Sequence, residues 1–192
     1  MPKPAAIIRP VVLVAAAALA LPGAADARRI AAWHSGPTAC DSANAKPSEA
    51  SNRQLVRGTL CLVNRERARR GLRRLSLNRR LSRAAENHSR AMVRNNFFSH
   101  DSLSGADFID RIRNVGYLNR ASAWAVAENL AWGSGSRAVP AAIVRSWMQS
   151  PGHKSNILTG RYREIGIGVV PGAPVRTSLP AATYTTDFGA RG

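Results

Sequence analysis

Two stretches in the first half of the chain carry apolar residues at helical spacing, each after a residue that suits an N-cap. The first starts at Ser51 or Asn52 and continues until Gly71 supplies a stop. The second starts after Asn78 and places one apolar stripe on a helix face. The stripe consists of Leu81, Ala84, Ala85, His88 and Met92. Both stretches predict helices that pack one face against a core.

Two further helices are predicted downstream. Ser104, followed three residues later by Asp107, is expected to open a short third helix that Gly116 closes. Pro140 is expected to begin the fourth, because its fixed φ suits the first turn of a helix. All the predicted helices therefore precede the closing part of the chain.

The closing part of the chain changes to a period of two. Three β-branched residues from Ile165 to Val169 alternate with Gly166 and Gly168, and residues 183–188 follow a turn rich in proline and glycine. These segments predict two strands of one sheet. Because helices come first and strands last, the pattern favours an α+β fold in which helices cover a small antiparallel sheet.

The first 27 residues have the composition of an export signal. Two basic residues precede an uncharged apolar run at 11–21, and Ala25–Ala27 forms a small-x-small cleavage site. The run is shorter than the roughly 20 residues that a membrane-spanning helix needs, and an uncleaved tail is the alternative. We expect a signal peptide at 1–27, an irregular lead-in at 28–51 and one domain at 52–192. The product is then secreted, extracellular or associated with the cell envelope.

Cys40 and Cys61 are the only cysteines of the chain. An even pair in an exported protein favours a disulfide, because disulfides persist outside the cytoplasm. Two free thiols or half of a metal site are the alternatives, and neither has supporting spacing. A Cys40–Cys61 bridge is therefore expected, with a stabilisation on the order of 3 kcal/mol from restricting the unfolded chain.

The chain is strongly basic, with a formal net charge of +17 at pH 7. Its arginines concentrate in a run where Glu66 is the only acid. The run comprises Arg65, Arg67, Arg69, Arg70, Arg73, Arg74, Arg79, Arg80 and Arg83. Such a surface can attract anionic polymers and lipids. The interpretation slightly favoured is a solvated helix face plus a loop, and nucleic acid is not expected as a partner of an exported protein.

The four histidines fall into two groups. His34 lies in the irregular lead-in and is expected to be exposed, whereas His88 on the apolar stripe is expected to be a hydrogen-bonded core histidine. His100 follows two phenylalanines that would fix a loop to the core, and His153 ends a breaker-rich turn after the fourth helix. Loops beside helices often carry functional side chains, so His100 and His153 are the candidates.

Glu128 is the acidic candidate. It lies in the nearly uncharged stretch Ala127–Gly133, where a carboxylate would be partly buried and would need a partner. Two interpretations have equal weight. One is a structural glutamate that holds backbone amides or an arginine, and the other is a metal ligand or acid-base group.

Taken together, several motifs resemble the bacterial branch of the CAP superfamily, which also holds cysteine-rich secretory, venom antigen and plant pathogenesis-related proteins. The resemblance covers about residues 55–189, and the order and spacing of the motifs make it specific. In chain order they are Leu62–Arg67 with Arg70–Leu72, Phe98–His100, Glu128–Ala131, Trp147–His153 with Asn156–Leu158, and Gly166–Val169.

The resemblance implies a three-layer α-β-α sandwich, with a small antiparallel sheet enclosed by helices and a central cleft lined by two histidines and two acids. His100, Glu128 and His153 match three of these four cleft positions. The fourth falls in the fourth helix, where this chain has no carboxylate. Asp187 or Glu164 could substitute, but no spacing argument brings either into the cleft.

The resemblance favours a non-catalytic module that holds a lipid, a peptide or a cell-wall fragment, and we expect a monomer. Zinc or another divalent metal is the expected cofactor, on His100, His153 and Glu128. The first alternative is a metal-assisted hydrolase, a peptidase or wall hydrolase, in which Glu128 moves the proton. The second is an envelope-associated protein that works through its basic surface.

Overall fold

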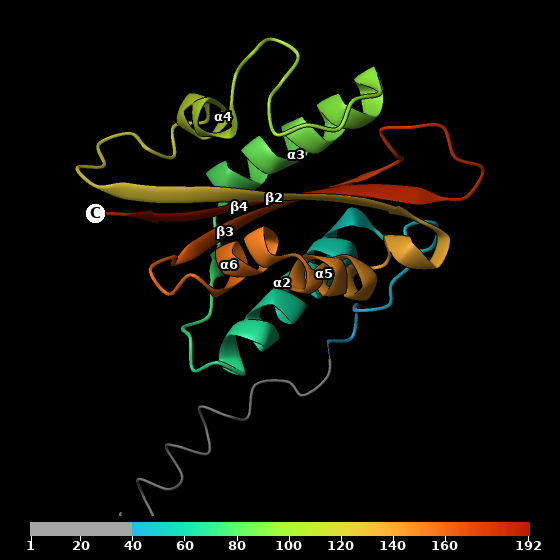
Figure 1. The fold of residues 1–192 in the computed structure, drawn as a ribbon, viewed down its shortest axis with the longest axis horizontal. Coiled ribbons are helices and arrows are strands. Elements are labelled where there is room, and N and C mark those ends of the chain that lie inside the picture. The colour runs from blue at the N-terminus through green and yellow to red at the C-terminus, as the bar shows by residue number, and fades with distance from the viewer. Residues whose placement is uncertain (1–39) are drawn as a thin grey trace, which may run out of the picture. The chain divides into compact units, whose positions relative to one another are not determined.

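The computed structural model describes residues 40–192. In this part of the chain a sheet lies between two layers of helices, so the expected three-layer α+β class is confirmed (Figure 1). The predicted signal peptide, His34 and the first part of the lead-in lie outside the described residues. The helices are α2 (Asn52–Ala68), α3 (Arg79–Asn95), α4 (Phe108–Asn114), α5 (Pro140–Gln149) and α6 (Pro151–Leu158).

The sheet has the strand order β1-β3-β4-β2 and holds more strands than the sequence pattern predicted. The strands are β1 (Ser76–Leu77), β2 (Trp124–Ser134), β3 (Glu164–Pro171) and β4 (Ala181–Arg191). β4 pairs antiparallel with both β2 and β3, whereas the two-residue β1 runs parallel to β3. A short 3-10 turn, Gly135–Ala138, joins β2 to α5.

The larger core lies between the sheet and the layer of α2, α5 and α6. Leu55, Trp147, Tyr184 and Phe188 are buried there. The Trp147 indole Nε1 donates a hydrogen bond to the Leu130 carbonyl at 2.9 Å, which satisfies its polar atom inside the core. On this side the predicted Cys40–Cys61 disulfide is confirmed, with 5.7 Å between the Cα atoms, and it ties the start of the described chain to α2.

Three of the predicted helix starts are confirmed and one is corrected. Ser51 caps α2 in a capping box with Gln54, and the Asn78 side chain accepts from two amides of α3. Pro140 occupies the first turn of α5. The third helix begins at Phe108 rather than near Ser104, because Asp107 is the N-cap and its side chain accepts from the Asp110 amide.

The breaker-rich sequence at His153 is a helix and not the predicted turn. Pro151 takes the first position of α6, where its missing N–H is not needed, and Ser150 serves as the residue between α5 and α6. His153 therefore sits in the first turn of a helix. Of the two histidines that were predicted to lie on loops, His100 does so and His153 does not.

Arg67 also departs from the expectation of a solvated arginine face. Its side chain is buried and donates to the carbonyls of four residues. These are Arg73, Ile157, Thr159 and Tyr162, at 2.7–3.4 Å. Burial lowers the pKa of Arg67, and nearby Arg163 lowers it further. This guanidinium is a structural link between α2 and the chain that leaves α6.

On the opposite face of the sheet, α3 packs directly against β3. A Cβ atom on Gly166 would collide with the backbone of Leu81 and Ser82, and one on Gly168 with the backbone of Ala85 and Glu86. The glycines of the predicted strand are thus the places where a helix approaches the sheet closely. No helix in residues 40–192 is long and apolar enough to cross a membrane.

Candidate functional site

The candidate site is centred on Glu128, which lies in the middle of β2 with its side chain facing α3 and α4. That side chain is 1% exposed, and both carboxylate oxygens have partners. Oε1 lies 2.8 Å from His100 Nδ1, and Oε2 accepts from Arg111 Nη2, also at 2.8 Å. The predicted need of Glu128 for a partner is confirmed. The structure supplies one arginine and one of the two candidate histidines.

His100 comes from the loop that follows α3, and a hydrogen bond from the core holds this loop in place. His88 Nε2 donates to the Ser99 carbonyl at 2.8 Å, so the predicted core histidine is confirmed with its hydrogen bond. Phe97 packs edge-on against His88, with ring centroids 5.9 Å apart. Phe98 is exposed, so only one of the two phenylalanines fixes the loop to the core.

Arg111 is a residue that sequence analysis missed. It lies on α4 with its side chain 12% exposed, and it also donates to Ser102 Oγ and the Ala106 carbonyl. Because Arg111 is 17 residues from Glu128 and on a different element, no local pattern connects them. The arginine neutralises the buried carboxylate and holds the loop of His100 near the sheet.

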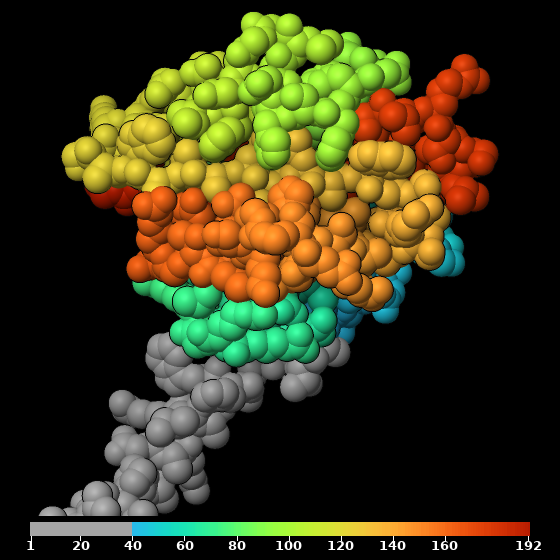
Figure 2. All heavy atoms as spheres, viewed as in Figure 1, coloured from blue at the N-terminus to red at the C-terminus, as the bar shows by residue number. Residues whose placement is uncertain are grey.

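His153 reaches the same edge of β2 from the other helical layer. Asn129 Nδ2 donates to the His153 carbonyl at 3.1 Å. Asn156 Nδ2 donates to the Glu128 carbonyl at 3.2 Å and to Asn129 Oδ1 at 2.9 Å. These two asparagines fix α6 to β2. In Figure 2 part of β2 is visible as a band between the two helical layers, on the face that carries α5 and α6.

The two candidate histidines differ in basicity. The hydrogen bond to Glu128 raises the pKa of His100, and burial opposes this in part. Burial lowers the pKa of His153, and the positive charge of His100 lowers it further. This effect of His100 on His153 indicates that the two rings lie in one electrostatic neighbourhood. His153 therefore has a free ring nitrogen over a wider pH range than His100.

Asp187 stands directly opposite Glu128 in the β2–β4 register, a position that the sequence did not reveal. It is 2% exposed, and within residues 40–192 its Oδ1 atom has no hydrogen-bond partner. Burial raises the pKa of Asp187, and the charge of Glu128 raises it further. Glu164, the other proposed substitute, instead binds Tyr117 and Asn78, at 2.8 and 2.7 Å. A second acid is thus present beside Glu128, though it is buried beneath the surface.

The chemistry of these donors fits a metal at the histidines better than at the carboxylate. Within the described residues no group of three or more His, Cys, Asp and Glu side chains is arranged to hold a metal ion. Glu128 already uses both oxygens, whereas His100 uses only Nδ1 and keeps Nε2 for a ligand. A carboxylate behind a metal-binding histidine is a common arrangement that orients the ring. Metal binding by His100, His153 and Glu128 stays a prediction.

Comparison with known proteins places this chain in a family. Residues 60–186 match the family described as "CAP: Cysteine-rich secretory protein family". The uncharacterized protein YkwD of Bacillus subtilis is 32% identical over 116 residues, which cover 60% of this chain and 42% of that protein. The chain spans less than half the length of the Bacillus subtilis relatives that it matches.

Two solved structures share the fold. An outer surface protein from Borrelia burgdorferi has a TM-score of 0.60 and 19% identity, over 74% of this chain and 97% of that one. An extracellular protein containing a SCP domain from Bacillus anthracis has a TM-score of 0.54 and 23% identity, over 72% of this chain and 43% of that one. The family match covers most of the chain and includes His100, Glu128 and His153. This chain belongs to the cysteine-rich secretory protein (CAP) family.

Proposed function

We propose that the chain is an exported binding module, in which His100 and His153 present ring nitrogens to a ligand and Glu128 orients His100. Export is supported by the leader-like composition of residues 1–27 and by the disulfide. It is further supported by structural relatives whose names describe an outer surface protein and an extracellular protein.

The observation that carries this proposal is the complete engagement of Glu128. A general base needs a free carboxylate oxygen within reach of the proton that it removes. Glu128 instead accepts from His100 and Arg111 and is almost wholly buried. This arrangement suits a group that fixes another side chain. No contact within residues 40–192 favours the hydrolase alternative over binding.

A divalent metal such as zinc would be held by His100 through Nε2 and by His153 through a ring nitrogen. The metal would supply a Lewis-acidic position for an oxygen or nitrogen atom of the ligand. The protein's part is to keep the two rings in place. Glu128 fixes the first through Nδ1, and the Asn129 and Asn156 hydrogen bonds fix the helix that carries the second.

The ligand classes proposed are a lipid, a peptide or a cell-wall fragment. Two large apolar side chains near the candidate residues in sequence support a ligand with an apolar part. Phe98 is 47% exposed and Trp132 is 37% exposed. Aromatic side chains of this kind contribute contact area at small entropic loss on binding.

Zinc titration by calorimetry tests the proposal. The wild-type chain is compared with His100→Ala, His153→Ala and the control Lys154→Ala, which removes an exposed neighbour on α6. Each histidine variant should lose zinc binding, whereas the control should bind like wild type. Unchanged zinc binding in either histidine variant would overturn the shared site.

Glu128→Gln separates an orienting role from direct ligation. If Glu128 orients His100, the variant should bind zinc roughly 10- to 100-fold more weakly and keep the same stoichiometry. Release of product from peptide or wall substrates by wild type, with loss in Glu128→Gln, would instead establish the hydrolase.

A further inference from the structure

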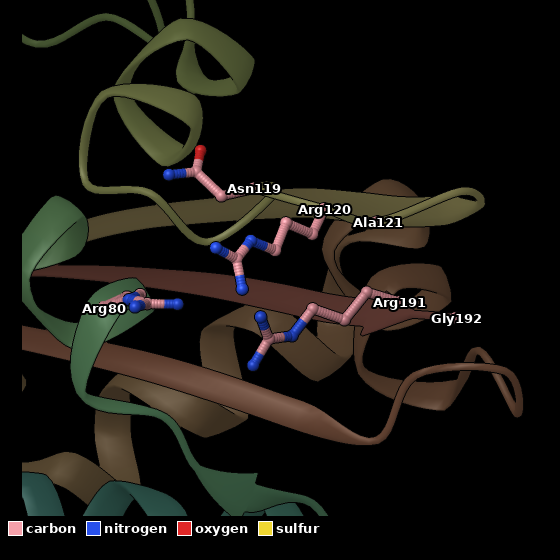
Figure 3. A pocket seen from close by; sticks show the side chains of 6 residues that line it. All are labelled: Arg80, Asn119, Arg120, Ala121, Arg191 and Gly192. Carbon is pink, nitrogen blue, oxygen red and sulfur yellow. The ribbon is translucent and has the colours of Figure 1, made fainter.

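Three arginines from separate elements meet at a second place, away from the histidines. Arg80 lies in the first turn of α3, Arg120 follows α4, and Arg191 ends β4. They line a hollow of about 680 Å³ together with Asn119, Ala121 and Gly192. Figure 3 shows the three guanidinium groups pointing toward one another across this hollow. None of the lining residues belongs to the candidate site described above.

The positive charge of this hollow is compensated only in part, because Gly192 at the end of the chain also lines it and carries a carboxylate. Arg80 and Arg120 form no ion pair and donate no side-chain hydrogen bond in the described part of the chain. Arg191 has one acidic neighbour, Glu164, whose Oε2 lies 3.7 Å from the Arg191 Nε atom. That carboxylate already accepts from Tyr117 and Asn78. Three like charges facing one space repel one another, and a bound anion would relieve this repulsion.

One of the three guanidinium groups is held in a fixed orientation. Arg191 lies over the Tyr117 ring at 4.8 Å from its centroid and donates through Nη1 to the Tyr117 carbonyl at 3.1 Å. These contacts use one face and one corner of the guanidinium. Because the group has five N–H donors, several remain for a ligand.

Backbone geometry also places Arg120. It is one of two non-glycine residues with positive φ in residues 40–192, at 62°. Residues other than glycine, asparagine and aspartate rarely adopt this conformation. From this turn the Arg120 side chain extends into the hollow, beside that of Arg191 (Figure 3).

We propose that this hollow, the arginine pocket, binds a phosphate group. A tetrahedral phosphate presents oxygens in several directions and can accept from three guanidinium groups at once, whereas a planar carboxylate suits one or two. Arginine pairs with phosphate through two parallel hydrogen bonds, which gives geometric selectivity beyond charge attraction. The pocket opens to solvent, so the phosphate can belong to a small ester or to a phospholipid headgroup.

The test uses the full chain and inorganic phosphate, followed by NMR of the arginine side-chain N–H groups. The double variant Arg80→Gln/Arg120→Gln removes two pocket charges, and Arg74→Gln/Arg79→Gln removes two exposed charges outside it. Wild type and the control should bind phosphate saturably and alike. The pocket variant should bind at least roughly tenfold more weakly, because charge-assisted hydrogen bonds are lost. Equal weakening in both variants, or shifts that never saturate, would overturn the proposal.

Vesicles then distinguish the two sources of the phosphate. Phosphatidylglycerol vesicles are compared with phosphatidylcholine vesicles at matched salt, using the same variants. Loss of phosphatidylglycerol binding in the pocket variant but not in the control identifies a headgroup as the source. Equal vesicle binding by both variants, with phosphate binding still lost only in the pocket variant, identifies a small phosphate ester.

Discussion

The two faces of the sheet have different compositions and different tasks. The face toward α2, α5 and α6 carries Ala127, Tyr184 and Phe188, which join the larger core. The face toward α3 and α4 carries Glu128, Thr185 and Asp187 at the alternate positions of the same strands. Neighbouring residues of β2 and β4 thus serve different layers, because side chains alternate along a strand.

The apolar face thus stabilises the fold, whereas the polar face forms the candidate site. The apolar face gains free energy from burial of large side chains, and the polar face holds buried groups that need partners. Glu128 has partners on both oxygens, whereas Asp187 beside it has an orphan oxygen. The polar face is therefore where substitutions can stabilise the fold as well as weaken it.

Removing a large side chain from the helical layer that packs on the apolar face should have the largest effect. Trp147 is 1% exposed, so Trp147→Ala should lower the free energy of unfolding by about 3–5 kcal/mol through lost contacts and a cavity. Trp132→Ala, on a residue that is 37% exposed, is the matched control and should change stability far less. Urea denaturation measures both. Similar losses in the two variants would contradict the proposed division of the faces.

Asp187→Asn on the polar face should stabilise the fold, by about 1 kcal/mol at neutral pH, because the amide removes a buried acid and can donate to Glu128. The folded pKa of Asp187 is raised by burial, so wild type loses stability as pH rises above 3.8 through that folded pKa. The gain should therefore be larger at neutral pH than near pH 3.8. Thermal unfolding at both pH values tests this, and a lower melting temperature at neutral pH would refute it.

The smallest expected effect is a change in pH dependence caused by His88. Burial lowers the folded pKa of His88 below 6.5. Its contribution to folding stability is therefore present above pH 6.5 and is lost as pH falls through the folded pKa. His88→Gln keeps a nitrogen donor for Ser99 but does not titrate, and it should flatten the decline of melting temperature under acidic conditions. His100→Gln should act oppositely, because its folded pKa is raised. If the melting temperature of His88→Gln falls with acid as steeply as that of wild type, His88 does not contribute to the pH dependence of stability.

Much of the fold follows from local sequence signals. The caps at Ser51 and Asn78 and the alternation from Ile165 to Val169 predicted α2, α3 and β3, because each signal acts within a few residues. β2 escaped prediction because alanines occupy its apolar face at 125, 127 and 131, where stronger β formers would mark a strand. α6 escaped because proline and glycine at its start are also typical of turns.

Only part of the candidate site followed from the sequence. His100 and Glu128 were singled out and lie in contact, and His88 was assigned correctly to the core, whereas a shared site with His153 stays a prediction. The partners of Glu128 depend on where α4 packs and on the β2–β4 register, and both are long-range properties. Without β2 as a strand, nothing in the sequence could place Asp187 opposite Glu128.

The close approach of α3 to β3 has a consequence for how this site can vary. Gly166 and Gly168 allow the backbone of α3 to rest on the sheet, and the loop after α3 carries His100. The distance between α3 and the sheet thus depends on the absence of a Cβ atom at these two glycines. A chain with alanine at either position would lift the helix, and the imidazole would move away from a carboxylate two strands distant. Glycine in β3 is therefore as much a requirement for the histidine–glutamate pair as the pair's own side chains.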